Sequence, residues 1–311
     1  LAGGVALNCV ANGILQRSGV FEDIWIQPAA GDAGGALGAA LEVWNQSLSN
    51  KGINHAASLT LPESTGDDMN GSLLGPEYNE KEICEALDSF DAVYLRFDEG
   101  ELLDRVSALL EDGKIVGWFQ GRMEFGPRSL GNRSILGDPR LVSLQSSINR
   151  KVKFRESFRP FAPAVLEERS SEYFDLKGSS PYMLKVANVA ESQLKKVLDK
   201  EEEGFDRIKY ERSTIPAVTH VDGSARVQTV NKYQNPLFWK LLKCFESKTN
   251  CGVLLNTSFN VRGEPVVCTP EDAYRCFVNT SIDWLAIGPF LLKRGDQPEA
   301  KPQQEFDPIP D

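Results

Sequence analysis

Basic residues concentrate in one stretch of an otherwise acidic chain. The 311 residues carry a formal net charge of −10 at pH 7, yet residues 122–159 hold seven Arg and two Lys against three carboxylates. That segment carries +6, so the rest of the chain carries −16. A compact basic segment in an acidic protein is typical of a site for a small, highly charged anion. The negative total argues against general nucleic-acid binding, whose surfaces are normally basic.

Within this segment, the glycine-rich stretch 121–133 has the composition of a phosphate-binding loop. Three Arg stand there among three Gly and one Pro. Guanidinium groups bind phosphate through paired hydrogen bonds, and glycines let the backbone lie close to a ligand. A surface loop of salt bridges is the competing interpretation. The candidate ligand-binding residues are Arg122, Arg128, Asn132 and Arg133.

A second basic cluster occupies residues 152–163, with Lys153, Arg155 and Arg159 spaced two and four residues apart. On a strand, Lys153 and Arg155 would point to one face, with Phe154 packed on the other. An exposed basic strand edge is the alternative. The surrounding Phe and Pro residues favour a buried anion site.

Polar side chains also stand at the edges of two apolar stretches, 220–228 and 256–260. Groups that orient a ligand belong at such edges. Taken alone they would pass as Asx and Ser turns, and His220 as a structural imidazole. The candidates are His220, Asp222, Arg226, Asn256, Ser258 and Asn260.

Glycines near the start of the chain form a further cluster. Backbone there could lie close to phosphate or ribose, although tight packing of small residues explains the pattern equally well. Asp32, between glycines, could cap a helix or bind a metal, and on the residues alone a cap is preferred. The candidates for nucleotide contact are Gly3, Gly4, Asn8, Gly34 and Gly35.

The elements expected to position these clusters alternate between strand and helix, which indicates an α/β or α+β fold. Residues 50–80 lose periodicity and indicate a linker. The predicted strands are 2–7, 22–28, 92–97, 114–119, 251–255 and two within 283–293. The predicted helices are 8–17, 36–47, 83–87, 100–110 with Gly113 after its end, and one capped by Thr269.

Several protein classes are excluded. No apolar run approaches the roughly 18 residues of a membrane span. The first residues resemble neither a start nor a signal peptide, so we expect a piece of a longer, cytoplasmic protein. Only His55 and His220 are present and no Gly-x-Ser-x-Gly occurs, which argues against a Ser-His-Asp hydrolase. Zinc is not expected, because the six scattered cysteines form no Cys-x-x-Cys pair.

Taken together, these segments resemble the O-carbamoyltransferases of antibiotic and Nod-factor biosynthesis, the NodU type. The resemblance covers nearly the whole chain and is carried, in the family's order, by residues 3–8, 28–35, 74–78, 121–133, 153–163, 220–228 and 256–260. It implies that 1–50 ends an actin-like ATPase domain, 51–80 is a linker, 81–300 is a YrdC-like domain and 301–311 is a polar tail.

The resemblance also implies a reaction. In that family the YrdC-like domain forms carbamoyladenylate from carbamoyl phosphate and ATP, for which we expect Mg²⁺. The other domain passes the carbamoyl group to a small-molecule hydroxyl, often of a sugar, with a bound metal that is usually iron. Neither nucleic acid nor membrane is an expected partner.

Residue roles follow by the same resemblance. Lys153 and Arg155 look like the family's Lys-x-Arg pair, and Ser258 with Asn260 like its Ser-x-Asn pair; with Arg128 they are expected to be catalytic. Asp32 looks like one metal ligand. The family's His-x-x-x-His ligands are missing, since neither His55 nor His220 has that spacing. The remaining candidates, expected to bind substrate, are Arg122, Asn132, Arg133, Arg159, His220, Asp222, Arg226 and Asn256.

Two alternatives stay open. One is a non-catalytic YrdC-type module that binds nucleotide or double-stranded RNA, against which the acidic total counts. The other is a threonylcarbamoyl-adenylate synthase of tRNA modification, a class that lacks the 121–133 loop in this form.

Overall fold

A computed structural model describes residues 1–51, 69–195 and 210–298. Its centre is a ten-stranded sheet in the order β1-β10-β9-β2-β3-β8-β4-β7-β6-β5. The pairs β2·β9 and β4·β7 are parallel, and the other neighbours are antiparallel. The strands are β1 (Leu95–Arg96), β2 (Val116–Phe119), β3 (Arg133–Gly137), β4 (Ala162–Leu166), β5 (Phe174–Asp175), β6 (Lys185–Val189), β7 (Ser224–Val230), β8 (Val253–Ser258), β9 (Trp284–Ile287) and β10 (Phe290–Lys293).

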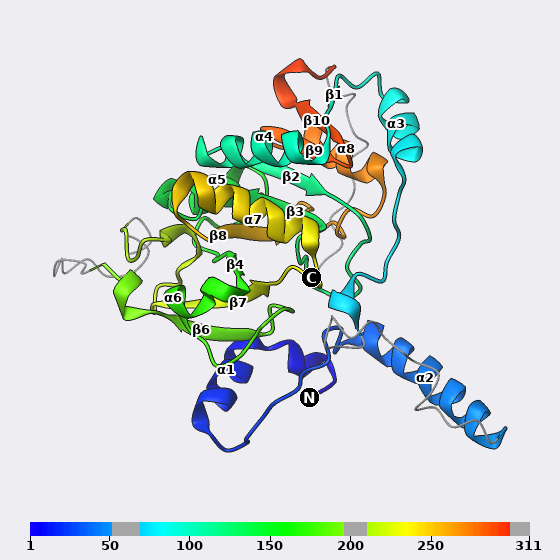
Figure 1. Cartoon of the computed structure of the whole chain (residues 1–311), viewed down its shortest axis with the longest axis vertical. Helices are drawn as coiled ribbons and strands as arrows, with labels where there is room; N and C mark the ends of the chain where they lie inside the picture. The colour runs from blue at the N-terminus through cyan, green and yellow to red at the C-terminus, as the bar shows by residue number, and fades with distance from the viewer. Residues whose placement is uncertain (52–68, 196–209, 299–311) are drawn as a thin grey trace.

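Helices surround this sheet, and the mixed α/β class expected from the sequence is confirmed (Figure 1). The division into an actin-like piece and a YrdC-like domain stays a prediction. The helices are α1 (Cys9–Ser18), α2 (Asp32–Asn50), α3 (Glu80–Asp88), α4 (Glu99–Glu111), α5 (Val142–Lys151), α6 (Ser170–Tyr173), α7 (Pro236–Thr249) and α8 (Pro270–Val278). Among the described residues, no helix has the length and apolarity that a membrane span requires.

Local sequence explains where several of these elements begin and end. Thr269 and Asp272 form a capping box at the start of α8, as the hydroxyl and carboxylate pattern predicts. Gly113 follows α4 with φ +75°, a conformation that favours glycine. The predicted pair of strands around 288–289 is β9 and β10.

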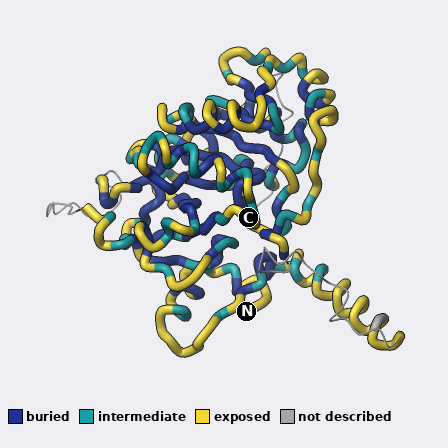
Figure 2. The backbone as a smooth tube through the Cα atoms, viewed as in Figure 1, coloured by how far each residue is buried: buried dark blue, intermediate teal, exposed yellow. Residues whose placement is uncertain are grey.

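The core lies between the sheet and the helices that pack on it. Strands β2, β3 and β4 are buried along their whole length. Helix α4 packs against α7, and both contact the sheet. In Figure 2 the sheet strands are almost continuously buried, whereas α2 is mostly exposed.

Residues 1–30 pack near strand β6, toward the edge of the sheet that ends in β5. Helix α1 lies against β6, where Asn12 Nδ2 donates to Leu184 O at 3.0 Å. A Cβ at Gly13 would lie 2.3 Å from Val186 O, so only glycine permits this approach. Helix α2 instead projects away from the sheet (Figure 1).

Three strand predictions need correction. Residues 2–7 form no strand, because Gly4–Leu7 closes into a 3-10 turn before α1. Residues 22–28 form none either; Gln27 N donates to Leu1 O at 3.0 Å, but no ladder continues from that bond. The strand predicted at 92–97 is reduced to β1, a two-residue edge pairing.

The described end of the predicted linker is packed against the 121–133 loop. Phe125 N donates to Ser72 O at 2.6 Å, and Met123 N donates to Pro76 O at 2.9 Å. Ser72 is 1% exposed. This segment therefore covers the loop, whereas residues 52–68 and the predicted tail from 299 onward lie outside the described residues.

Candidate functional site

The strand register brings the sequence clusters to one end of the sheet. Ser258, the last residue of β8, pairs with Ser134 near the start of β3. Ala162, the first residue of β4, pairs with Asn256 of β8, and β7 runs parallel to β4. Strands β3, β4 and β7 thus begin where β8 ends. The segments before these three strands and after β8 are the four clusters that the sequence singled out, apart from the N-terminal glycines.

Lys153 lies at the centre of this end of the sheet and is only 3% exposed. Its Nζ donates to Ser258 Oγ at 3.2 Å, Asn260 Oδ1 at 2.8 Å and Asn260 O at 3.0 Å, and also to Ser258 O. Ser258 Oγ in turn donates to Asn260 Oδ1 at 2.7 Å. The structure therefore places the predicted Lys-x-Arg and Ser-x-Asn residues Lys153, Ser258 and Asn260 in direct contact.

The surroundings of Lys153 disfavour its charge. Burial, followed by the charge of the neighbouring Arg155, lowers the pKa of Lys153 to about 7. All four of its acceptors are uncharged oxygens, and no described carboxylate forms an ion pair with it. An anion entering the site would supply the missing negative charge and raise this pKa.

Lys153 and Arg155 do not lie on a strand, contrary to the prediction. They follow α5 in a turn in which Lys153 N donates to Ile148 O at 2.9 Å. Phe154 has φ +47° and is 55% exposed instead of packed. Because Phe154 has a left-handed backbone conformation, the chain turns at this residue. The directions of the Lys153 and Arg155 side chains are therefore set by this turn and not by the alternation of side chains along a strand.

Arg155 is held by neutral partners. Its Nε donates to Asn149 Oδ1 at 2.7 Å, and its guanidinium lies 5.1 Å from the ring centroid of Phe161. Burial, followed by the charge of Arg159, lowers the pKa of Arg155. Arg159 itself is exposed and pairs with Glu156 at 3.0 Å, so it lies at the rim.

A further guanidinium, that of Arg226, lies near those of Arg128 and Arg155. Burial, followed by the charge of Arg128, lowers the pKa of Arg226 to about 10, and Arg155 adds to this effect. Arg226 is hydrogen-bonded to Cys9, and Arg128 Nη2 donates to Leu7 O at 3.3 Å. Arg128 Nε is buried with no partner among the described atoms. Buried donors left open in this way are suited to a ligand.

Arg133 is used differently, although it belongs to the same loop. It is fully buried, and burial lowers its pKa to about 10. Its guanidinium lies 3.6 Å from the ring centroid of Phe119. Its Nη atoms donate to the backbone oxygens of Gln120, Gly121, Asn132 and Pro76. Arg133 therefore shapes the loop, and its expected substrate contact stays a prediction.

Glu124, which the sequence interpretation missed as a functional residue, organises the same loop. Its Oε1 accepts the backbone N–H groups of Leu130, Asn132 and Arg133 at 2.6–3.3 Å. Asn132 Nδ2 donates to Arg122 O at 2.7 Å, while the Arg122 side chain is exposed and lies 3.5 Å from Glu77. Glu124 is the only carboxylate among the three Arg of residues 121–133, and this feature of the sequence could have identified it.

Asn256 and His220 serve the local fold. Asn256 is fully buried, and its Nδ2 donates to Gln228 Oε1 at 2.7 Å. His220 Nδ1 lies 3.0 Å from Ser224 Oγ, which donates to Asp222 Oδ1 at 2.7 Å. Burial lowers the pKa of His220. This arrangement matches the alternative in which His220 is a structural imidazole.

The N-terminal candidates lie in the 3-10 turn Gly4–Leu7 and its N-cap, in the N-cap of α1, and in the first turn of α2. Asn8 Oδ1 caps α1 by accepting from Ala11 N at 3.1 Å. Gly34 permits close packing, since a Cβ there would lie 2.1 Å from Ala29 O, and Gly35 N donates to Gly31 O. Asp32 begins α2 with an exposed side chain. Gly3 and Gly4 are exposed.

A metal bound at Asp32 would have no second or third ligand of the usual kinds beside it among the described residues. Within the described part of the chain, no three His, Cys, Asp or Glu side chains come together as a metal site. The residues present therefore do not fit a complete metal centre, and Asp32 as a ligand stays a prediction.

Comparison with known proteins identifies the family to which this arrangement belongs. Residues 107–294 match the family model described as "Carbamoyltransferase C-terminus". The chain belongs to the carbamoyltransferase family. Residues 1–41 match the model described as "Carbamoyltransferase N-terminus". The family predicted from the sequence motifs is thereby confirmed.

Three relatives illustrate the extent of the match. The uncharacterized protein sll1178 of Synechocystis sp. is 53% identical over 98% of this chain and 49% of its own length. Nodulation protein NolO of Bradyrhizobium diazoefficiens is 40% identical over 94% and 49%. The 3'-hydroxymethylcephem-O-carbamoyltransferase of Amycolatopsis lactamdurans is 31% identical over 95% and 49%. The chain thus spans about half the length of these relatives.

Proposed function

We propose that the end of the sheet around Lys153 binds the phosphates of ATP and carbamoyl phosphate and forms carbamoyladenylate. The observation that carries this proposal is the set of cations Lys153, Arg128, Arg155 and Arg226, which form no ion pair with a described carboxylate. Polyphosphate supplies the dense negative charge that such a site lacks. Family membership supplies the carbamoyl chemistry.

The chemistry needs no nucleophilic side chain. Water attacks the phosphorus of carbamoyl phosphate and the bond from phosphorus to the carbamoyl oxygen breaks, which gives inorganic phosphate and carbamate. A carbamate oxygen then attacks the α-phosphorus of ATP. A bond from carbamate oxygen to phosphorus forms, the bond to the bridging oxygen breaks, and pyrophosphate leaves. Lys153 and Arg155 would stabilise charge on the phosphates through fixed hydrogen bonds. Ser258 and Asn260 would hold the Lys153 ammonium in place.

The second half of the proposal is transfer to an acceptor hydroxyl in a longer protein. One relative is named for carbamoylating a hydroxymethyl group, which supports a small-molecule alcohol as the acceptor class. In that protein Asp32 would be one of several metal ligands, and Gly3, Gly4, Asn8, Gly34 and Gly35 would contact nucleotide.

Exposed apolar side chains in the first fifty residues support a missing partner for that region. Trp25 is 64% exposed, Val43 68% and Trp44 56%. Exposed apolar side chains of this size are typical of surfaces that another part of a protein covers. We therefore propose that the half found only in the relatives packs there.

The test is pyrophosphate release from ATP in a protein that joins this chain to the remaining half. Release with carbamoyl phosphate, and none with threonine plus bicarbonate, is the expected result. The opposite preference would indicate threonylcarbamoyl-adenylate synthesis, and nucleotide binding with neither reaction would indicate a non-catalytic module. The 311-residue chain alone should make adenylate weakly or not at all. Robust carbamoyl transfer by this chain would contradict the proposal that transfer requires the longer protein.

A further inference from the structure

Two buried carboxamides on α5 hold the turn that carries Lys153, Arg155 and Arg159. Gln145 and Asn149 are four residues apart, so their side chains share one face of the helix. Gln145 Nε2 donates to Phe158 O and Arg159 O, both at 3.2 Å. Asn149 Nδ2 donates to Arg159 O at 2.8 Å and Ser157 O at 3.2 Å. Both side chains therefore fix the backbone of the same turn.

Asn149 alone also contacts a cation of the site. Its Oδ1 accepts from Arg155 Nε at 2.7 Å, and its backbone oxygen accepts from Arg155 N at 3.0 Å. Asn149 is fully buried, whereas the Arg155 side chain is partly exposed. The contact occupies Nε and leaves the outer Nη groups of Arg155 available to a ligand.

The acceptor on Asn149 is neutral, which matters for an anion site. A carboxylate at this position would orient Arg155 equally well, but it would form an ion pair and cancel the charge that attracts phosphate. A carboxamide fixes the guanidinium without adding a counter-ion to the charge of Glu156, which already acts on Arg155.

We propose that Asn149 is a positioning residue for anion binding, which directs Arg155 toward the phosphates while keeping its full positive charge. The inference rests on the proposed function of the Lys153 site. It assigns to a buried helix residue a role in affinity that acts through Arg155 and not through contact with substrate.

The experiment measures binding of tripolyphosphate to the 311-residue chain by calorimetry. Asn149→Asp keeps the size and the Oδ1 acceptor but adds the counter-ion, and we expect binding at least tenfold weaker. Gln145→Glu is the matched control, because it makes the same change of amide to acid on the same helix and turn without touching Arg155. It should bind within about threefold of the wild type.

A double-mutant cycle separates positioning from a general structural role. If Asn149 acts through Arg155, then Asn149→Asp should cost less than twofold in an Arg155→Met background. Equal losses in both backgrounds, or equal losses for Asn149→Asp and Gln145→Glu, would overturn the inference. Circular dichroism checks the fold. If Asn149→Asp does not fold, Asn149→Ser, which is neutral but cannot reach Nε, enters the same cycle with the same expected non-additivity.

The outcomes also distinguish this inference from the proposed function. If Arg155→Met leaves tripolyphosphate binding unchanged, the anion site itself is wrong. If Arg155→Met weakens binding but Asn149→Asp does not, only the role of Asn149 is wrong.

Discussion

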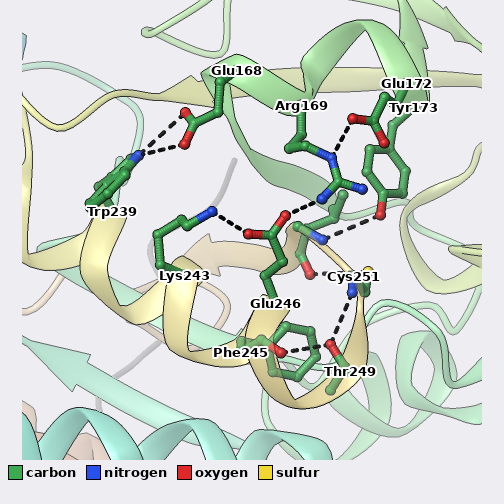
Figure 3. Close-up of polar contacts among 12 residues, drawn as sticks. Glu168, Arg169, Glu172, Tyr173, Trp239, Lys243, Phe245, Glu246, Thr249 and Cys251 are labelled. Carbon is green, nitrogen blue, oxygen red and sulfur yellow. Dashed lines mark hydrogen bonds and ion pairs between the residues drawn. The ribbon is translucent and has the colours of Figure 1, made fainter.

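The protein holds its cations in two contrasting ways. Around α6 and α7, Arg169 pairs with Glu172 and Glu246, and Glu246 also pairs with Lys243 (Figure 3). The Glu246 side chain is only 11% exposed, so its charge is largely desolvated. The positive charges of Arg169 and Lys243 compensate for it. The charges in this Arg169–Glu246 cluster are balanced within the protein.

At the Lys153 site, in contrast, the cations have no ion-pair partner among the described carboxylates. Lys153 and Arg155 donate their hydrogen bonds to carbonyl, hydroxyl and carboxamide oxygens, none of which carries charge. Burying a cation without a counter-ion is costly. The lack of a counter-ion at the Lys153 site supports the anion site proposed above.

The largest expected effect comes from removing the unbalanced charge. In a protein that joins this chain to the remaining half, Lys153→Ala/Arg155→Ala should lower adenylate formation roughly 10²–10⁴-fold, because each charge-assisted contact is worth about 1.5–3 kcal/mol. The fold should survive, since the change relieves repulsion between neighbouring cations. ATP–pyrophosphate exchange measures the effect, with circular dichroism as the folding control. Exchange within a few-fold of the wild type would mean that these cations are only a basic turn.

The balanced cluster should respond in stability and not in binding. Glu246→Gln leaves Arg169 and Lys243 without their shared carboxylate, and we expect the free energy of unfolding to fall by about 1–3 kcal/mol. Tripolyphosphate affinity should stay unchanged. Urea unfolding and calorimetry check the two halves of this prediction. A loss of affinity comparable to that of the Lys153 variants would erase the distinction between the clusters.

The sequence predicted much of the fold but little of the difference between the Arg169–Glu246 cluster and the Lys153 site. The caps of α8 and α4 and the pair β9–β10 are local features, and they are confirmed because residues within a few positions determine them. Residues 2–7 and 22–28 have the composition of strands but lack a neighbouring strand to pair with. Pairing is a tertiary property that composition does not encode.

The candidate site shows the same limit at the level of side chains. Arg128 and Arg133 look equivalent in the 121–133 loop, but the Nη atoms of Arg133 donate to four backbone oxygens, whereas those of Arg128 donate to one, Leu7 O. Asn149 was not among the residues that the sequence singled out, although it is fully buried and contacts Arg155. Which polar groups a protein satisfies itself depends on packing, so the sequence could propose the set of cations but not their roles.

The pH dependence of binding should report on Lys153. Burial lowers its pKa to about 7 in the folded protein, and an anion favours the charged form, so the affinity should be greatest below pH 7 and fall above it. The ratio of wild-type to Lys153→Met affinity cancels the ionisation of tripolyphosphate itself. We expect that ratio to shrink by up to about tenfold per pH unit above pH 7.

Stability should change in the opposite sense over the same range. Between about pH 7 and the ordinary lysine pKa of about 10.4, the unfolded chain retains a proton that the folded protein has released. The free energy of unfolding of the wild type, relative to Lys153→Met, should therefore rise with pH in this window. A flat difference would show that the four acceptor oxygens keep Lys153 charged.

The smallest expected effect concerns the carboxylate at the rim of the site. Glu156 lies 3.0 Å from Arg159 and 3.9 Å from Arg262, with its side chain 42% exposed. If the site attracts anions through unbalanced charge, Glu156→Gln should tighten tripolyphosphate binding about twofold, because exposed ion pairs are weak. The gain should disappear in 1 M salt, which screens exposed charges. Glu172→Gln, which removes a carboxylate from the Arg169–Glu246 cluster, is the matched control and should leave affinity unchanged. Weaker binding by Glu156→Gln would instead mean that Glu156 holds Arg159 in position, and the rim would then resemble the balanced cluster.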